Sequence, residues 1–256
     1  MPILEVQDMS RHFGGLAAVS HLTFEVGKGE IRGFIGPNGA GKTTTFNVIS
    51  GFYAPSSGKV IYDGKDISGL KTSAIAALGL IRTFQHTTLF QEFTLLDNAL
   101  MGCHLHAQTG VAGAVLGTDR QIKAAAREKA LEVLEFFGLY ERRDELAMNL
   151  PHGLQRALGM AVALAADPRI LLLDEPFTGM NPEETRHMME LIQKVQQRGI
   201  TILLVEHDMQ AVMGICEKIT VLNFGRLLVE GLPEEIRSHP EVIEAYLGAS
   251  GGAAAN

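Results

Sequence analysis

The sequence predicts an α/β fold with a mostly parallel sheet, built from buried strands that alternate with helices. Residues 36–43 read GPNGAGKT and lie between an apolar strand pattern at residues 30–35 and a helix-like run at 44–50. Two further apolar runs, at residues 170–173 and 200–205, are separated by a helical stretch. That spacing is typical of parallel strands connected through a helix.

The first part of the chain has the pattern of short strands, three before the GPNGAGKT run and one after it. Residues 3–6 and 21–26 alternate between apolar and polar side chains, and glycines mark the turn before the strand at 30–35. A short strand is expected at residues 58–64, followed by a short helix at 74–78. We therefore expect an antiparallel β subdomain near the N-terminus, beside the parallel core sheet.

The middle of the chain, residues 94–146, is mostly helical in pattern. Apolar residues share one helical face by i, i+4 and i+7 spacing; they are Ala126, Ala130, Val133, Leu134 and Phe137. Within this part, residues 107–118 are rich in glycine and alanine without charge, which fits either a flexible loop or a loosely packed helix hairpin. The pattern predicts a helical lobe inserted into the α/β fold.

The α/β rhythm then returns. A helix at residues 182–197 follows the strand at 170–173, and a second helix at 209–216 follows the strand at 200–205. Two apolar segments, 219–222 and 227–229, flank Asn-Phe-Gly-Arg as a hairpin. The tail at 251–256 is expected to be disordered.

Composition limits the possible functions. The chain has 256 residues, 46% of them hydrophobic, and a net charge of −7, so a globular core is expected and nucleic acid is excluded as the main partner. Cys103 and Cys216 lack metal-ligand spacing and are expected to be buried thiols without a role.

No segment of the sequence predicts membrane insertion. The longest uncharged apolar run covers residues 157–166, far short of the roughly 20 residues that a spanning helix needs. The first six residues do not resemble a signal peptide. We therefore expect a cytosolic chain that reaches a membrane only through a partner.

The run at residues 36–43 has the G-x-x-x-x-G-K-[ST] pattern of a phosphate-binding loop. Its glycines allow successive backbone N–H groups to surround a phosphate at the start of a helix, where the helix dipole favours negative charge. Lys42 is expected to reach the β- and γ-phosphates, and Thr43 to offer a hydroxyl to Mg²⁺. The residues assigned to this site are Gly36, Pro37, Asn38, Gly39, Ala40, Gly41, Lys42, Thr43 and Thr44. The alternative is a glycine-rich turn without a ligand.

Two adjacent carboxylates end the predicted strand at residues 170–173. Ligands of open α/β sheets bind at the carboxyl ends of the strands, so Asp174 is expected to hold Mg²⁺ through water and Glu175 to polarise an attacking water. The alternative is a strand that merely ends in acidic turn residues. With the phosphate loop present, we favour an ATP site.

These motifs resemble those of the ATPase subunits of ABC transporters, in the family's order and over residues 3–247. Gln85 matches the Q-loop glutamine, residues 150–156 lie at the signature motif, residues 179–182 at the D-loop, and His207 at the switch histidine. The resemblance implies an ABC-type P-loop fold. It also implies that Gln85 contacts Mg²⁺ and senses a membrane subunit, and that His207 donates a hydrogen bond to the γ-phosphate.

Phe13 lies where the family has an aromatic residue that stacks on adenine, although a core phenylalanine would also fit. A histidine after a buried strand is often structural, but the position of His207 after the strand at 200–205 favours the catalytic interpretation. Catalysis is thus assigned to Glu175, His207 and Gln85.

The signature motif departs from the family's commonest form, Leu-Ser-Gly-Gly-Gln. That motif binds the γ-phosphate of ATP held by the opposite subunit. The residues assigned to this contact are Leu150, Pro151, His152 and Gly153. Proline offers neither a hydroxyl nor an N–H, and Leu154 replaces the glutamine. Binding of the partner's ATP is therefore expected to be altered.

The D-loop assignment covers Gly179, Met180 and Asn181, which are expected at the dimer interface. Asn181 stands where the family usually has aspartate, which retains hydrogen bonding but removes the charge.

The segments RTFQ at 82–85, GMNPE at 179–183, VEHDM at 205–209 and EAYLG at 244–248 resemble the importers of branched-chain amino acids. Urea and amide importers share this branch. The resemblance implies a peripheral ATPase on the cytoplasmic face of a membrane, with ATP sandwiched in a head-to-tail dimer, two permease subunits and, indirectly, a solute-binding protein. A non-transport ABC ATPase acting on DNA or ribosomes is disfavoured, since no basic face or coiled-coil insertion is visible.

Two further expectations complete the hypothesis. The single domain would comprise a nucleotide-binding lobe at residues 1–85 and 157–225, a helical lobe at 86–156, and a C-terminal extension at 226–250. A partly degenerate subunit that regulates a catalytic partner remains the alternative, because Pro151 could impair the partner's site while Lys42 and Glu175 serve this chain's own.

Overall fold

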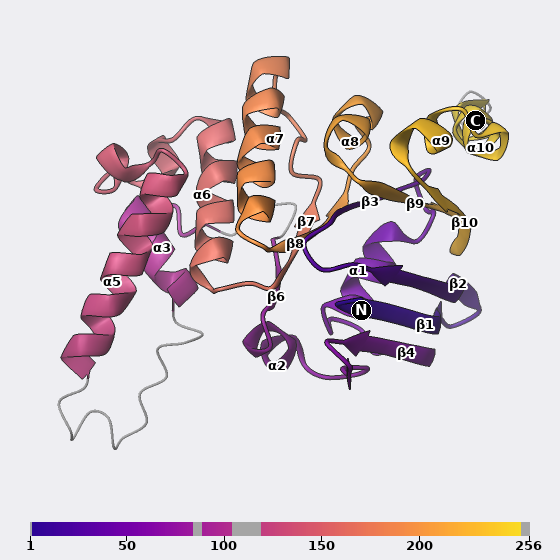
Figure 1. Cartoon of the computed structure of the whole chain (residues 1–256), viewed down its shortest axis with the longest axis horizontal. Coiled ribbons are helices and arrows are strands. Elements are labelled where there is room, and N and C mark those ends of the chain that lie inside the picture. The colour runs from indigo at the N-terminus through magenta and orange to yellow at the C-terminus, as the bar shows by residue number, and fades with distance from the viewer. Residues whose placement is uncertain (1, 84–88, 104–118, 252–256) are drawn as a thin grey trace.

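The chain forms two sheets, and helices lie on both faces of the larger one (Figure 1). The computed structural model describes residues 2–83, 89–103 and 119–251. Gln85, residues 107–118 and residues 252–256 of the predicted tail lie outside the described residues. The helices of the structure are α1 (Lys42–Ile49), α2 (Thr72–Ala77), α3 (Leu95–Cys103), α5 (Asp119–Phe136), α6 (His152–Ala165), α7 (Pro182–Gln197), α8 (Met209–Ile215), α9 (Pro233–Arg237) and α10 (Pro240–Gly251), with 3₁₀ turns η1 (Tyr140–Arg142) and η2 (Ala147–Asn149).

The larger sheet has six strands in the order β10-β9-β3-β8-β7-β6. Its strands are β3 (Ile31–Ile35), β6 (Leu80–Arg82), β7 (Ile170–Asp174), β8 (Thr201–Val205), β9 (Lys218–Asn223) and β10 (Arg226–Gly231). All neighbouring pairs are parallel except the β9–β10 hairpin. Every residue of β3, β7 and β8 is buried, as expected for a sheet covered on both faces. The predicted α/β fold class is confirmed.

The strands of this sheet contribute alternate side chains to two cores. Leu171 and Leu173 of β7 pack with α7, α8 and the helices α3, α5 and α6. Ile170 and Leu172 of the same strand pack with α1 and the second sheet. Successive side chains of a strand point to opposite faces, and here each face is buried against a different layer. The strand is therefore apolar throughout residues 170–173.

The second sheet is antiparallel, in the order β2-β1-β4-β5. Its strands are β1 (Leu4–Phe13), β2 (Leu16–Val26), β4 (Ser57–Tyr62) and β5 (Lys65–Asp66). Phe24 of β2 lies 4.7 Å from Phe34 of β3, and Phe34 lies 5.9 Å from Phe46 of α1, centroid to centroid. This aromatic cluster holds α1 between the two sheets.

The prediction of two short strands at residues 3–6 and 21–26 was wrong in extent. The β1–β2 hairpin is much longer, and the alternation did not reveal its full length because register shifts between Val6 and His12 interrupt it. Asp8 and His21 adopt φ angles of 49° and 51° at these irregularities. Bulges of this kind accommodate extra residues and break the period of two on which the prediction depended.

The helices α3, α5 and α6 pack side by side at the end of the molecule opposite β1 and β2 (Figure 1). The predicted apolar face is confirmed, since Ala130, Val133 and Leu134 of α5 and Phe137 just after it are at most 3% exposed, while Ala126 is half-buried and packs against the same core. Cys103 and Cys216 are buried free thiols, and burial raises the pKa of both. Within the described residues, no helix combines the length and hydropathy that a bilayer-spanning segment requires.

Candidate nucleotide-binding and catalytic site

The glycine-rich run at residues 36–43 forms a tight loop between β3 and α1. Gly36 and Gly41 have φ angles of 150° and 98°. A Cβ atom at Gly36 would lie 2.2 Å from the carbonyl oxygen of Leu222, and one at Gly41 would lie 2.7 Å from that of Ala18. Only glycine fits these positions, because backbone approaches closely on the side where a side chain would project. The helix α1 begins immediately afterwards at Lys42, two residues earlier than predicted.

Lys42 folds back over this loop. Its Nζ donates hydrogen bonds to the carbonyl oxygens of Gly36, at 2.6 Å, and Pro37, at 3.0 Å. Burial lowers the pKa of Lys42, while the nearby carboxylates of Glu175 and Asp174 oppose that shift. The ammonium group thus lies within electrostatic range of Asp174, at the end of β7, and of Glu175, which follows it.

Asp174 is the last residue of β7 and Glu175 follows it directly, at the carboxyl end of a strand that lies between β8 and the edge strand β6. Asp174 is 6% exposed. Glu175 adopts a left-handed backbone conformation with φ 49°, held by a 2.9 Å hydrogen bond from its N–H to the carbonyl oxygen of Val205. Such a conformation costs about 1–3 kcal/mol for a residue other than glycine. This strain turns the Glu175 side chain away from the strand direction and towards the next loop.

His207 contacts Glu175 directly. The distance from His207 Nε2 to Glu175 Oε1 is 2.9 Å, and Thr178 Oγ1 donates to Glu175 Oε2 at 3.2 Å. The two residues are 32 positions apart in sequence but meet because β7 and β8 are parallel neighbours in the sheet. A carboxylate hydrogen-bonded to an imidazole can accept a proton while the imidazole donates one.

Glu206 is a buried residue of this site to which the sequence assigned no role. Its side chain is 2% exposed and accepts hydrogen bonds from the N–H groups of Phe177, at 2.8 Å, and His207, at 2.9 Å. Burial raises the pKa of Glu206, and the hydrogen bonds from these N–H groups oppose the increase. Glu206 therefore joins the loop after Glu175 to the loop that carries His207.

Replacing Glu206 by glutamine should change how stability depends on pH. Below the ordinary glutamate value of 4.5 the carboxyl is protonated in both the folded and unfolded states. As pH rises from there through the raised pKa of the folded state, only the unfolded state ionises fully, so the parent loses stability relative to Glu206→Gln. The slope should reach at most about 1.4 kcal/mol per pH unit. Urea denaturation of both proteins between pH 4 and pH 8 measures this, and a difference independent of pH would contradict it.

A cavity of about 520 Å³ brings the phosphate loop and the catalytic pair together. It is lined by residues 38–44 together with Phe13, Leu16, Ala17, Ala18, Glu175, His207 and Phe224. Phe13 is 38% exposed, so it is not a core residue, and its ring packs edge-to-face on Tyr53 at 5.2 Å. An exposed, supported aromatic ring beside a phosphate-binding loop suits stacking on a nucleobase.

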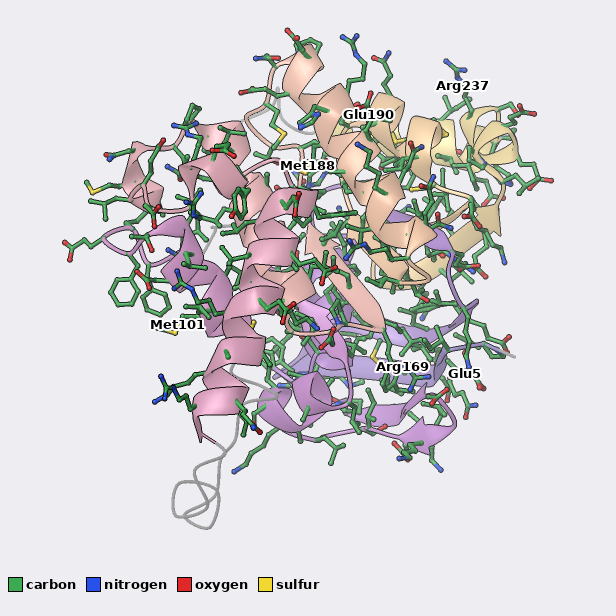
Figure 2. All side chains as sticks on the ribbon, turned by 60° about the vertical axis from the view of Figure 1, so that its left-hand side comes forward. Glu5, Met101, Arg169, Met188, Glu190 and Arg237 are labelled. Atoms are coloured by element: carbon green, nitrogen blue, oxygen red, sulfur yellow. The ribbon has the colours of Figure 1, made fainter. Side chains whose placement is uncertain are left out.

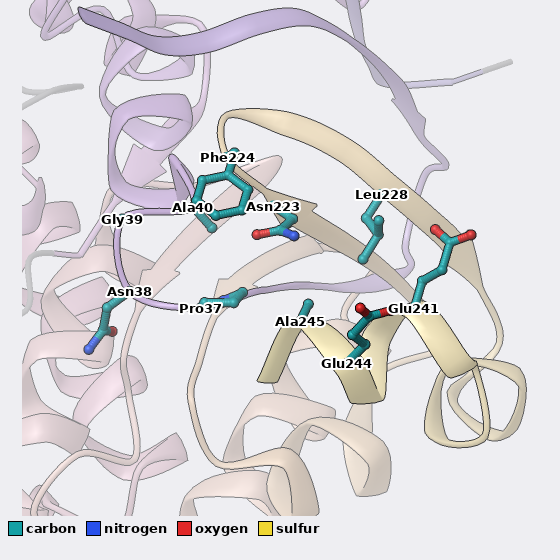
Figure 3. A pocket seen from close by; sticks show the side chains of 10 residues that line it. All are labelled: Pro37, Asn38, Gly39, Ala40, Asn223, Phe224, Leu228, Glu241, Glu244 and Ala245. Atoms are coloured by element: carbon teal, nitrogen blue, oxygen red, sulfur yellow. The ribbon is translucent and has the colours of Figure 1, made fainter. Parts of the chain in front are cut away.

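A larger cavity of about 940 Å³ lies on the other side of the phosphate loop (Figure 3). Pro37 and Ala40 contribute to one wall, and Glu241 and Glu244 of α10 to the opposite one. Two carboxylates without a lysine or arginine in the lining disfavour a polyphosphate there. The smaller cavity, with Lys42 and the start of α1, is therefore the candidate nucleotide site.

The residues near Lys42 fit a magnesium ion that arrives with a nucleotide. Thr43 is an exposed residue in the first turn of α1 and lines the cavity, and Asp174, which is not among the lining residues, has its carboxylate within electrostatic range of the neighbouring Lys42. Both are hard oxygen donors of the kind that Mg²⁺ prefers. Within the part of the chain that the structure describes, no group of three or more His, Cys, Asp or Glu side chains forms a metal site. Such a two-donor arrangement suits an ion that takes its other ligands from phosphates and water.

The residues of the predicted signature motif do not reach this cavity. Among the described residues that line it, none comes from 150–153. Leu150 is buried, Pro151 precedes α6 as its N-cap without a side-chain hydrogen bond, and His152 and Gly153 begin the helix. These residues thus lie at the N-terminus of α6 and outside the lining of their own chain's cavity.

Asn181 of the predicted D-loop caps α7. Its side chain accepts from the N–H groups of Glu183 and Glu184, while Glu184 Oε2 accepts from the N–H of Asn181. Asparagine and aspartate cap helices about equally well, which explains how this position tolerates loss of the charge. Gly179 lies beside His152, since an added Cβ would be 3.5 Å from His152 Cε1. Met180 is half-buried and packs on the core. The structure thus brings the D-loop and signature segments together.

Comparisons with known proteins agree with this geometry. A family model described as ABC transporter matches residues 19–178, and one described as branched-chain amino acid ATP-binding cassette transporter matches residues 226–251. The first match covers the phosphate loop, the signature segment and β7, and the second covers β10, α9 and α10.

Two relatives are similar over nearly their full length. The high-affinity branched-chain amino acid transport ATP-binding protein LivG of Escherichia coli (strain K12) is 44% identical over 250 residues, which make up 96% of this chain and 98% of LivG. The protein of the same description named BraF, from Pseudomonas aeruginosa, has the same identity and the same coverage.

A crystal structure of a nucleotide-free ATP-binding cassette from an ABC transporter superposes with a TM-score of 0.85 and 30% sequence identity, and the match covers 96% of this chain and 99% of the other. The resemblance of the motifs is thereby confirmed, and the chain belongs to the ATP-binding proteins of the ABC transporter family.

Proposed function

We propose that this protein is the ATP-hydrolysing motor of an ABC importer that carries branched-chain or other hydrophobic amino acids. The observation that supports this most strongly is the cavity in which the phosphate loop, Glu175 and His207 face the same space. The names of the relatives at 44% identity support the choice of solute.

The side chains divide the reaction between them. ATP would bind with its adenine on Phe13 and its phosphates against the backbone N–H groups of residues 38–43. Lys42 would exchange its contacts with Gly36 and Pro37 for the β- and γ-phosphates. Glu175 accepts a proton from the attacking water as the water oxygen bonds to the γ-phosphorus and the bond to the bridging oxygen breaks. His207 donates a hydrogen bond to the γ-phosphate oxygens as their charge changes.

The metal in this proposal is Mg²⁺, which neutralises charge on the β- and γ-phosphates when bound. Thr43 and Asp174 would hold it from this chain, and by family resemblance Gln85 would also contact it. The fit of the hard oxygen donors beside Lys42 supports this assignment.

Each ATP site in this proposal needs two chains arranged head to tail. The position of residues 150–153 outside their own chain's cavity supports such a dimer, because a phosphate contact at the start of α6 must then serve another chain. Closure of the dimer on ATP would pull the permease subunits, since the nucleotide contacts both chains only in the closed state. The motor would act at the cytoplasmic face of the membrane, bound through the permeases.

An apolar surface patch on the helical elements supports a permease contact. Phe90 and Phe93 are 52% and 40% exposed and stack at 5.1 Å. The segment that carries them lies beside Leu146 and Met148, because the N–H of Met148 bonds to the carbonyl oxygen of Gln91 at 3.1 Å. Met101 of α3 also faces outward at this edge of the molecule (Figure 2). Exposed apolar clusters of this kind mark interaction sites.

Replacing both Phe90 and Phe93 by aspartate should uncouple the motor from its permeases. Transport should fall at least about tenfold, because two buried aromatic contacts are lost at the interface, while hydrolysis by the isolated chain should stay within about twofold of the parent. Leu232→Asp, at another exposed apolar side chain, serves as the control and should leave transport unchanged. Equal transport by the Phe90/Phe93 variant and the control would contradict the assignment.

The experiment that tests the proposed function is uptake by proteoliposomes containing the complete importer and its solute-binding protein. Leucine should accumulate only with ATP, and Glu175→Gln should abolish accumulation. Uptake of urea or a short amide in place of leucine would support the alternative solute class of this branch. A transporter that retains full uptake with Glu175→Gln would support the alternative of a regulatory subunit. The proline at position 151, where the family usually has a serine, favours that alternative.

A further inference from the structure

Arg82, the last residue of β6, is buried beside the carboxylate that we assign to the metal site. Its side chain and that of Asp174 are each 7% exposed, and Arg82 Nη2 donates to Asp174 Oδ2 at 2.7 Å. The pairing follows from the sheet, in which β6 is the parallel neighbour of β7 and Arg82 lies beside Leu172. A buried ion pair in which one partner is a metal ligand needs an explanation beyond stability.

The same guanidinium also binds the helix that follows the phosphate loop. Arg82 Nη1 donates to Asn47 Oδ1 at 2.6 Å and lies 3.3 Å from Ser50 Oγ. The guanidinium carbon lies 5.9 Å from the centre of the Phe46 ring. One planar group thus fixes the position of Asp174 relative to α1, whose first residues are Lys42 and Thr43.

The charged groups near the Arg82–Asp174 ion pair indicate which alternative contact of Asp174 the pair prevents. Lys42 and the carboxylates of Asp174 and Glu175 lie close enough to influence one another electrostatically. Without Arg82, Asp174 would be free to pair with Lys42, a cation within electrostatic range, and would then compete with the phosphates for that ammonium group. With Arg82 present, one carboxylate oxygen is held and the other remains available to the water shell of the metal.

We propose that Arg82 is a positioning residue for the magnesium site: it fixes and orients Asp174 so that the metal strengthens nucleotide binding. The proposal rests on the proposed ATP and Mg²⁺ binding at this cavity. Residues that orient metal ligands typically change metal affinity by about 10- to 100-fold when they are replaced. Arg82 should therefore govern the metal-dependent part of nucleotide affinity and leave the metal-free part unchanged.

The test measures binding of a fluorescent ATP analogue to the purified chain, once with excess Mg²⁺ and once with EDTA. The ratio of the two affinities gives the contribution of the metal without any need for hydrolysis. In Arg82→Gln this ratio should fall about tenfold, with affinity in EDTA within about twofold of the parent. Arg82→Lys keeps the charge but cannot bridge Asp174 and Asn47, so its affinity ratio should lie between those of the parent and Arg82→Gln.

Arg32→Gln is the matched control. Arg32 is also buried in the sheet, with a side chain 3% exposed, and it pairs with Glu30 and Glu230 away from the cavity. Its replacement should lower the melting temperature but leave the affinity ratio unchanged. If Arg82→Gln does not fold, Asn47→Ala removes an anchor of the guanidinium and should lower the ratio in the same direction.

The outcomes separate this inference from the proposed function. An unchanged ratio in the folded Arg82 and Asn47 variants, or an equal loss of affinity with and without metal, would overturn the role of Arg82. If the parent itself binds the analogue equally well in Mg²⁺ and in EDTA, the metal site of the proposed function fails instead.

Discussion

Replacing Glu175 by glutamine should lower ATP hydrolysis by about 10²- to 10⁴-fold, the usual contribution of a general base. Glutamine keeps the size of the side chain but cannot accept the proton of the attacking water. The contact with His207 at 2.9 Å and the strained backbone at φ 49° point the Glu175 side chain into the cavity. Binding of MgATP should stay within about threefold of the parent, because the phosphates contact Lys42 and the loop instead.

Steady-state phosphate release and equilibrium binding of MgATP check this prediction together. Glu190→Gln, at an exposed position in the middle of α7, is the matched control and should hydrolyse ATP like the parent. Parent-like hydrolysis by Glu175→Gln would show that another group accepts the proton, and loss of MgATP binding would show that the carboxylate belongs to the binding site.

The second large effect concerns the unequal halves of a mixed dimer. In the proposed dimer, the site formed by this chain's phosphate loop would have Lys42, Glu175 and His207, whereas the site completed by this chain's signature segment would receive Pro151 in place of a serine. Losing a hydroxyl and an N–H near a charged phosphate should cost about 1.5–3 kcal/mol, or about 10- to 100-fold in turnover at that site. Lys42→Ala should therefore abolish most turnover, and the equivalent change in the partner should have a much smaller effect.

Single-turnover hydrolysis in the mixed dimer, with each phosphate-loop lysine replaced in turn, measures this asymmetry. Pro151→Ser provides a complementary gain of function, because serine restores the hydroxyl and the N–H and also supplies the side-chain cap that α6 lacks. It should raise turnover at the partner's site by about tenfold. Equal loss from either lysine, or no response to Pro151→Ser, would argue against the asymmetry.

The parts of the fold with strong periodicity were predictable from sequence. The strand at 170–173 and the helix at 182–197 match β7 and α7, because the strand is buried on both faces and the helix has a Pro at its first position and an Asn cap. The long β1–β2 hairpin was not predictable from alternation, since its bulges near Asp8 and His21 change which face each side chain occupies.

The candidate site also has residues that the sequence predicts and residues that it does not. The phosphate loop could be predicted from its glycines, because no other residue fits the backbone at Gly36 or Gly41. The roles of Glu206 and Arg82 depend instead on contacts with Phe177 and Asp174, which are 29 and 92 positions away. The only signal in the sequence was a charged residue at the end of an apolar strand, and that pattern fits a solvated turn equally well. These contacts became visible only once the parallel strands aligned their carboxyl ends.

The most direct test of the composite ATP site is a structure of Glu175→Gln with MgATP, alone or with its partner subunit. Our account predicts a triphosphate in the cavity of Lys42 and His207, an adenine on Phe13, and residues 150–153 of a second chain against the γ-phosphate. A nucleotide in the cavity lined by Glu241 and Glu244, or a γ-phosphate site complete within one chain, would contradict it.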